Sequence, residues 1–111
     1  MLDLSVALNT KAYEVKLIDG KILHLKRPTQ AIQEMLVKME MLAKQNDNEK
    51  IFGIITSVFT RILNRNEDNI IFTEDKIKDE YDLALQMILL KDYFEYWNKD
   101  VSNNVNFQVS Q

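Results

Sequence analysis

The segment 13–29 constrains the fold more than any other part of the chain, because it predicts a β-hairpin that leads directly into a helix. Apolar residues alternate with polar ones over 13–17 and again over 23–26, which is typical of strands with one buried face. The Asp-Gly pair between the two stretches is a strong turn signal. Since the rest of the chain has helical periodicity, the sequence predicts an α+β fold, with an N-terminal β-hairpin packed on a bundle of about three α-helices.

The length of the hairpin loop decides which side chains share a face. A two-residue loop would place the apolar side chains of the two strands on opposite faces. A three-residue loop over 18–20 places Val15 opposite Leu23 and Tyr13 opposite Leu25, so that one face is fully apolar. Because register follows the buried face, we expect the three-residue loop, with its glycine in the left-handed conformation of a bulge.

Length and composition indicate one small globular domain. The chain has 111 residues, of which 46% are hydrophobic and 28% charged, and its formal net charge is −3. These are ordinary values for a globular protein. We expect a single α+β domain over 1–100 and a flexible polar tail over 101–111, a stretch rich in Asn, Gln and Ser.

Targeting and membrane signals are not found in the sequence. The first nine residues have neither the basic region nor the apolar stretch of a signal peptide. No apolar run approaches the roughly 18 residues of a membrane-spanning helix. The chain has no cysteine, which excludes disulfides and fits a reducing compartment. We therefore expect a cytoplasmic protein.

Three helical stretches follow the hairpin. Thr29 can cap the first helix, which we expect to end near Gln45. Asn46 followed by Glu49 resembles a capping box for the second helix, and Thr73 can cap the third. The buried stripes predicted for the first two helices consist of Ile32, Met35, Leu36, Met39, Leu42, Ile51, Ile55, Val58 and Ile62.

The third helix has apolar residues on two different faces. The phase of its apolar pattern changes near Glu80, so either the helix kinks there or its second half is apolar on most sides. A helix that is apolar on most sides is hard to bury within a chain of this size. This pattern therefore predicts an oligomer or a bound partner. One apolar row consists of Ile77, Tyr81, Leu85 and Ile88, and the other of Leu83, Met87, Leu90, Phe94 and Trp97.

A tyrosine-rich row on this helix is the candidate protein-binding site. Tyrosines beside leucines are typical of contact surfaces, whereas Phe94 and Trp97 fit core packing better. We expect the row to contact a client protein or another copy of the chain. Its members are Leu85, Leu89, Tyr93 and Tyr96.

Catalytic, cofactor and metal sites are not indicated. His24 is the single histidine, and its strand position opposite Glu14 is more typical of a solvated side chain than of a general base. One histidine without cysteine makes a transition-metal site improbable. The acidic pairs at 67–68 and 74–75 lack the spacing of a calcium loop. With no basic patch and no nucleic-acid motif, the sequence predicts a protein that is not an enzyme, has no cofactor and binds other proteins.

The order of these elements resembles the tail assembly chaperones of long-tailed bacteriophages and prophages, especially those of Gram-positive hosts. The resemblance covers residues 2–98 and rests on Leu-Asp-Leu at the start, the Asp-Gly hairpin, the helix opened by Arg27-Pro28-Thr29, and the last helix, which is opened by 72–75 and has Tyr93-Phe94 near its end. The pattern contains no catalytic signature. It implies a non-enzymatic role in the cytoplasm of the bacterial host, and the length resembles the short form of the family that lacks a frameshifted extension.

The resemblance also implies partners. Tail assembly chaperones bind the tape measure protein, a long and aggregation-prone helical protein, and help to recruit the major tail protein during tube assembly. The alternatives are a structural head–tail or neck component of the phage particle and a small bacterial protein-interaction adaptor. A homo-oligomer is compatible with each, because the outer edges of the hairpin can pair with another copy.

Overall fold

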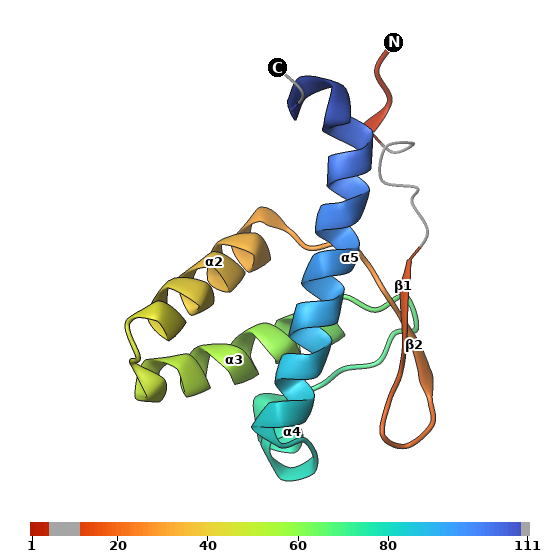
Figure 1. Cartoon of the computed structure of the whole chain (residues 1–111). Helices are drawn as coiled ribbons and strands as arrows, with labels where there is room; N and C mark the ends of the chain where they lie inside the picture. The colour runs from red at the N-terminus through yellow and green to blue at the C-terminus, as the bar shows by residue number, and fades with distance from the viewer. Residues whose placement is uncertain (5–11, 110–111) are drawn as a thin grey trace.

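The computed structural model describes residues 1–4 and 12–109, with side chains described up to Trp97. This part of the chain is an α+β arrangement in which a two-stranded hairpin precedes four helices (Figure 1). The predicted fold class is confirmed. The described part of the chain has four helices where about three were predicted, because the last predicted helix is interrupted. The elements are β1 (Tyr13–Lys16), β2 (Ile22–Leu25), α2 (Gln30–Lys44), α3 (Asn48–Leu63), α4 (Glu74–Glu80) and α5 (Leu83–Val109).

The hairpin adopts the predicted register. Val15 pairs with Leu23 and Tyr13 pairs with Leu25, and the Leu17 N–H donates to the Lys21 carbonyl at 2.8 Å to close the three-residue loop. The loop glycine has a φ of 88°, in the left-handed region. One face of the hairpin is therefore apolar and lies against the helices.

The segment 64–72 pairs with the outer edge of β2. The Lys26 N–H donates to the Arg65 carbonyl at 2.8 Å, and the Glu67 N–H donates to the His24 carbonyl at 2.9 Å. Because this segment satisfies the backbone of β2, the sheet edge left unpaired within residues 1–4 and 12–109 is the outer edge of β1.

Helices α2 and α3 form an antiparallel pair, and the turn between them differs by one residue from the prediction. Thr29 caps α2 as expected, accepting from the Ile32 N–H at 3.4 Å. Asn46 has a φ of 59° and ends α2 in the left-handed conformation, so it cannot cap α3. The cap is Asp47, which accepts from the Lys50 N–H.

The last helical stretch is broken at Tyr81, so of the two alternatives for the change of apolar phase near Glu80 the structure has an interruption of the helix. Thr73 caps α4 as predicted, but Tyr81 is extended, with φ −123° and ψ 126°. Asp82 then caps a new helix, accepting from the Leu85 N–H at 2.8 Å. The change of apolar phase in the sequence thus corresponds to two helices with separate directions.

Helix α5 is the central element of the fold. It lies between the β-hairpin and α2 and packs across α3 (Figure 1). It continues to Val109, so most of the segment predicted to be a flexible tail is helical, and residues 110–111 lie outside the described residues. The fully buried residues of the core come from β2, α3, α4 and α5, and they are Leu23, Leu25, Val58, Ile62, Leu63, Ile77 and Tyr93.

Candidate interaction surface

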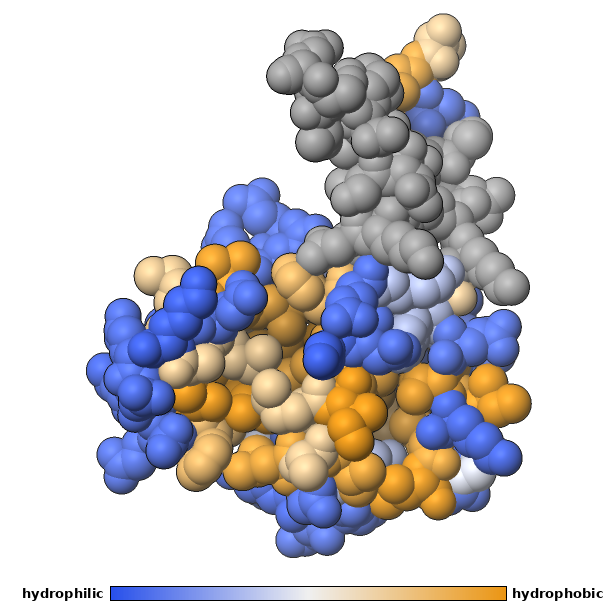
Figure 2. Space-filling view, in the orientation of Figure 1, coloured by the Kyte–Doolittle hydropathy of each residue, from blue (hydrophilic) through white to orange (hydrophobic). Residues whose placement is uncertain are grey.

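The middle of α5 forms a ridge between two apolar grooves. One groove separates α5 from α2, and the other separates α5 from β1. Lys91 and Glu95 line both grooves and therefore mark the ridge. Figure 2 shows apolar side chains gathered across the face that α2, α3 and α5 present. Such a surface is typical of protein contacts.

The groove between α2 and α5 has a volume of about 690 Å³. The apolar stripe of α2 forms one wall, and the second apolar row of α5 forms the other. Met39 and Phe94 are partly buried against the core, whereas Met87 is 39% exposed at the rim. Methionine side chains adapt to differently shaped partners. The residues lining this α2–α5 groove are Leu36, Met39, Glu40, Met87, Leu90, Lys91, Phe94 and Glu95.

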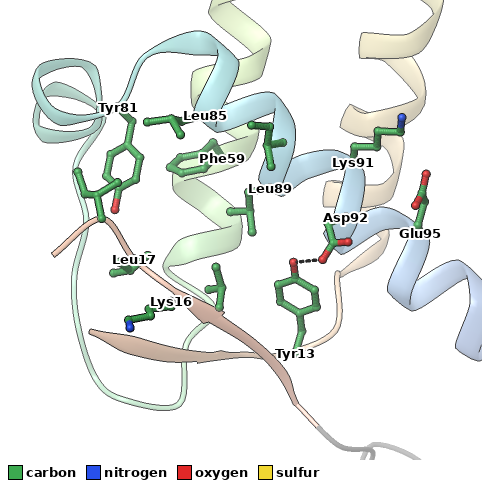
Figure 3. Close-up of a pocket in the computed structure, with 13 residues that line it drawn as sticks. Tyr13, Lys16, Leu17, Phe59, Tyr81, Leu85, Leu89, Lys91, Asp92 and Glu95 are labelled. Atoms are coloured by element: carbon green, nitrogen blue, oxygen red, sulfur yellow. Dashed lines mark hydrogen bonds between the residues drawn. The ribbon is translucent and has the colours of Figure 1, made fainter. Parts of the chain in front are cut away.

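The groove between β1 and α5 is smaller, about 490 Å³. Figure 3 shows Leu17, which directly follows β1, on one side and Leu85 and Leu89 of α5 on the other. Ile88 is 66% exposed at its rim. The residues lining this β1–α5 groove are Tyr13, Val15, Lys16, Leu17, Ile18, Phe59, Tyr81, Leu85, Ile88, Leu89, Lys91, Asp92 and Glu95.

A tyrosine–aspartate hydrogen bond closes one end of the β1–α5 groove. The Tyr13 hydroxyl donates to the Asp92 carboxylate at 2.5 Å (Figure 3). Burial raises the pKa of Tyr13, and the hydrogen bond to Asp92 raises it further. The bond fixes the hairpin to α5 across 79 positions of sequence.

The predicted binding row does not form one exposed surface. Tyr93 is fully buried and Leu89 is 7% exposed, whereas Leu85 is 40% exposed and Tyr96 is 36% exposed. The Tyr93 hydroxyl donates to the Lys26 carbonyl at 2.6 Å, and burial raises its pKa. Tyr93 and Leu89 therefore belong to the core, because the hairpin covers this face of α5. Of the four residues predicted to contact a client or another copy, only Leu85 and Tyr96 lie at the surface of the structure.

The tyrosines instead form an aromatic cluster between the hairpin and α5. The Tyr13 ring meets the rings of Tyr93 and Tyr96 edge-on, with centroids 5.4 and 5.3 Å apart. The Trp97 ring lies beyond them, with the Arg27 guanidinium 5.6 Å from its centroid. Edge-to-face pairs of this kind stabilise packing beyond the area they bury, so the cluster holds α5 to the hairpin.

Sequence reasoning missed Met87 and Ile88 as surface residues. Both were placed in apolar rows, but a row shows only which side chains share a face. Ile88 follows Leu85 on the side facing the β1–α5 groove, and Met87 faces α2 across the other groove. The sequence signal for their exposure was the change of apolar phase near Glu80. It corresponds to the break at Tyr81, which separates the buried face of α4 from the open faces of α5.

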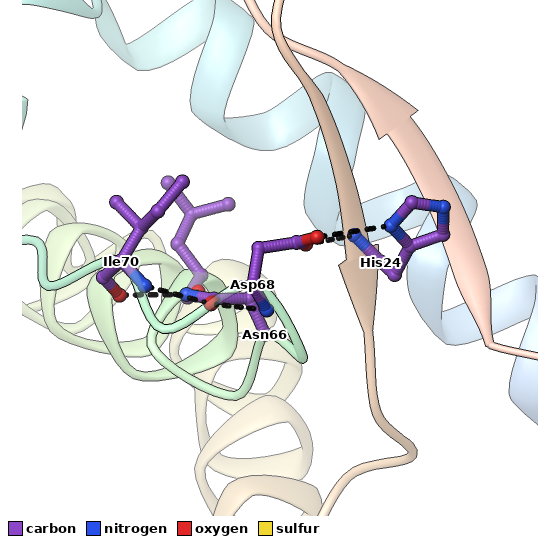
Figure 4. Close-up of polar contacts among 5 residues, drawn as sticks. His24, Asn66, Asp68 and Ile70 are labelled. Atoms are coloured by element: carbon purple, nitrogen blue, oxygen red, sulfur yellow. Dashed lines mark hydrogen bonds and ion pairs between the residues drawn. The ribbon is translucent and has the colours of Figure 1, made fainter.

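The single histidine has a structural role. The His24 N–H donates to the Asp68 carboxylate at 2.9 Å, and its ring Nδ1 lies 3.3 Å from the other carboxylate oxygen (Figure 4). The backbone hydrogen bond from His24 lowers the pKa of Asp68. His24 thus helps to hold the 64–72 segment against β2, opposite Glu14 as the register requires.

Metal and membrane features can be assessed for the same residues. Within residues 1–4 and 12–109, no group of three or more His, Cys, Asp or Glu side chains is arranged to hold a metal ion. Across the described helices, none has the length and apolarity needed to cross a bilayer. Comparison of the chain with protein-family models, with curated proteins and with solved structures finds no match.

Proposed function

We propose that this protein is a non-enzymatic tail assembly chaperone of a long-tailed phage or prophage, and that it binds the tape measure protein in the α2–α5 groove. The observation that carries the proposal is the groove itself, an open apolar channel between two helices with an exposed methionine at its rim. The sequence resemblance to tail assembly chaperones supplies the identity of the client.

The shape of the groove suits a helical client. An amphipathic helix binds by placing its apolar face in a hydrophobic channel, with anchoring side chains at helical spacing. The two walls of the groove come from helices, and Met39 and Met87 face it from opposite walls. A long client with many slightly different helical segments needs a surface that can repack, which methionine provides.

The charges at the rim indicate which flanking residues the client carries. Glu40 and Glu95 are acidic and Lys91 is basic, so the rim has an excess of one negative charge. Complementarity favours client helices whose apolar face is bordered by more Lys and Arg than Asp and Glu. Such charges set the association rate and the orientation more than the affinity.

The remaining parts of the proposal concern the setting. The chaperone acts in the cytoplasm of the bacterial host, keeps the tape measure protein soluble before the tube forms, and helps to recruit the major tail protein. Both partners follow from the resemblance. An assembly chaperone leaves the finished tail, so mass spectrometry of purified particles should not detect it, whereas a structural neck component would be present in stoichiometric amounts.

Co-expression with the tape measure protein tests the client groove. Met87→Glu places a charge at the exposed rim of the groove and should abolish solubilisation of the client. Met41→Glu is the matched control, because Met41 is a 56% exposed helical methionine that lines neither groove. If the client is equally soluble with both variants, and both are folded by circular dichroism, the groove is not its binding site.

A further inference from the structure

The outer edge of β1 has backbone groups available for pairing. Alternate residues of an antiparallel strand direct their N–H and C=O groups to opposite sides. The odd-numbered residues direct their backbone N–H and C=O groups toward β2, as the hydrogen bond from the Leu17 N–H to the Lys21 carbonyl, just beyond β1, shows. Glu14 and Lys16 face away, and no hydrogen bond within the described part of the chain engages their outward N–H and C=O groups.

The charges on this edge are self-complementary in one alignment. Two β1 strands can form antiparallel hydrogen bonds only where residues with outward-pointing N–H and C=O groups lie opposite each other. The twofold axis that relates the strands must therefore pass through Glu14, Val15 or Lys16. Centring on Glu14 or on Lys16 places like charges directly opposite each other, which is destabilising. Centring on Val15 places Glu14 of each copy opposite Lys16 of the other, and this alignment forms both hydrogen-bonded pairs.

The apolar surface beside the edge supports the same arrangement. The β1–α5 groove lies along β1, and its rim includes Leu85 and Ile88, which are 40% and 66% exposed. A twofold axis through Val15 joins the two hairpins into one sheet and places the α5 helices of both copies on the same face of that sheet. These apolar side chains then approach one another across the axis, where their burial stabilises the pair.

We propose that a second copy of this chain pairs its β1 strand with β1, antiparallel and centred on Val15, to form a homodimer with a continuous four-stranded sheet. The interface is isologous, since the same edge serves both copies. Strand pairing over four residues is small by itself, so the dimer is weak and concentration-dependent. It uses the side of α5 opposite the α2–α5 groove and does not depend on the proposed client.

A charge swap tests the alignment. Glu14→Lys and Lys16→Glu each turn two attractive pairs into two repulsive ones, and each should raise the dimer dissociation constant roughly tenfold. Combining the two substitutions restores opposite charges at both pairs, so the double variant should return to within about threefold of the wild type. Both side chains are exposed and point away from the core, so the fold is retained.

Sedimentation equilibrium over a range of concentrations measures these constants. A wild-type chain that stays monomeric at its highest soluble concentration overturns the proposal. A double variant as weak as the single variants also overturns it, because recovery is specific to this pairing.

A cysteine placed on the twofold axis gives a second test. Val15 would face its counterpart in a pair whose Cα atoms lie roughly 4.5 Å apart, close enough for a disulfide. The chain has no cysteine, so Val15→Cys introduces a single thiol and should form a covalent dimer under mild oxidation. The control is Ile22→Cys, a 52% exposed position on β2, because two strands would lie between it and its counterpart in the joined sheet. Equal cross-linking of both variants would indicate random collision and contradict the alignment.

Discussion

Replacing Asn66 with alanine should destabilise the protein through the 64–72 segment. The side chain is 7% exposed and makes four hydrogen bonds to backbone groups. Its amide donates to the carbonyls of Leu63 and Ile70, each at 2.7 Å, and its oxygen accepts from the N–H groups of Asp68 and Ile70, each at 3.0 Å (Figure 4). Alanine leaves all four backbone groups without these partners.

The size of the effect follows from the burial of those groups. The bond to Leu63 is buried, so its loss costs about 1.5 kcal/mol, while the three partly buried groups regain water and cost about 0.5 kcal/mol each. The sum, about 3 kcal/mol, is a large share of the roughly 5–15 kcal/mol that stabilises a domain. With a urea slope of about 2 kcal/mol/M, the unfolding midpoint should fall by about 1.5 M.

Urea unfolding followed by circular dichroism measures this change. The control is Asn48→Ala, an exposed position in the first turn of α3, which should change stability by less than about 0.5 kcal/mol. Amide hydrogen exchange should also accelerate at Lys26 and Glu67, whose N–H groups join the segment to the hairpin. A loss below about 0.5 kcal/mol, which is the range of ordinary surface substitutions, would refute the reasoning.

Three further predictions concern the hairpin and its contacts. Gly20→Ala should cost about 1 kcal/mol in thermal unfolding, because the φ of 88° is unfavourable for a residue with a side chain. Burial raises the pKa of Tyr13 and Tyr93 in the folded state, so stability should be constant below about pH 10 and fall as pH rises further. Replacing both with phenylalanine should flatten this alkaline loss in urea titrations. The lowered pKa of Asp68 predicts a contribution that is complete above about pH 4 and is lost as pH falls below it. Asp68→Asn should therefore show a smaller acid-induced fall in the unfolding midpoint than the wild type.

The local features of the fold could be predicted from the sequence. The hairpin register follows from the alternation around Val15 and Leu23, and the caps at Thr29 and Thr73 follow from hydroxyl side chains that precede apolar periodicity. The turn before α3 was misassigned because Asn46 and Asp47 can both cap a helix. Asparagine tolerates the left-handed conformation that ends α2, which leaves the cap to the aspartate.

The long-range contacts could not be predicted from periodicity. Tyr93 lies 67 positions from Lys26, whose carbonyl it binds. Its spacing shows that it shares a face with Leu89, but not that the hairpin covers that face. Asn66 has the composition of a surface loop residue, yet it is buried because the loop folds around its amide. Such contacts depend on which elements meet, which a single sequence does not specify.

Calorimetric titration of this protein with helical fragments of the tape measure protein tests the client groove most directly. We predict binding with a negative heat-capacity change, since apolar surface is buried. Met87→Glu should weaken the affinity at least about tenfold, the effect of about 1.4 kcal/mol, while Met41→Glu should leave it unchanged. Fragments that do not bind, or that bind both variants as tightly as the wild type, would contradict a client site between α2 and α5.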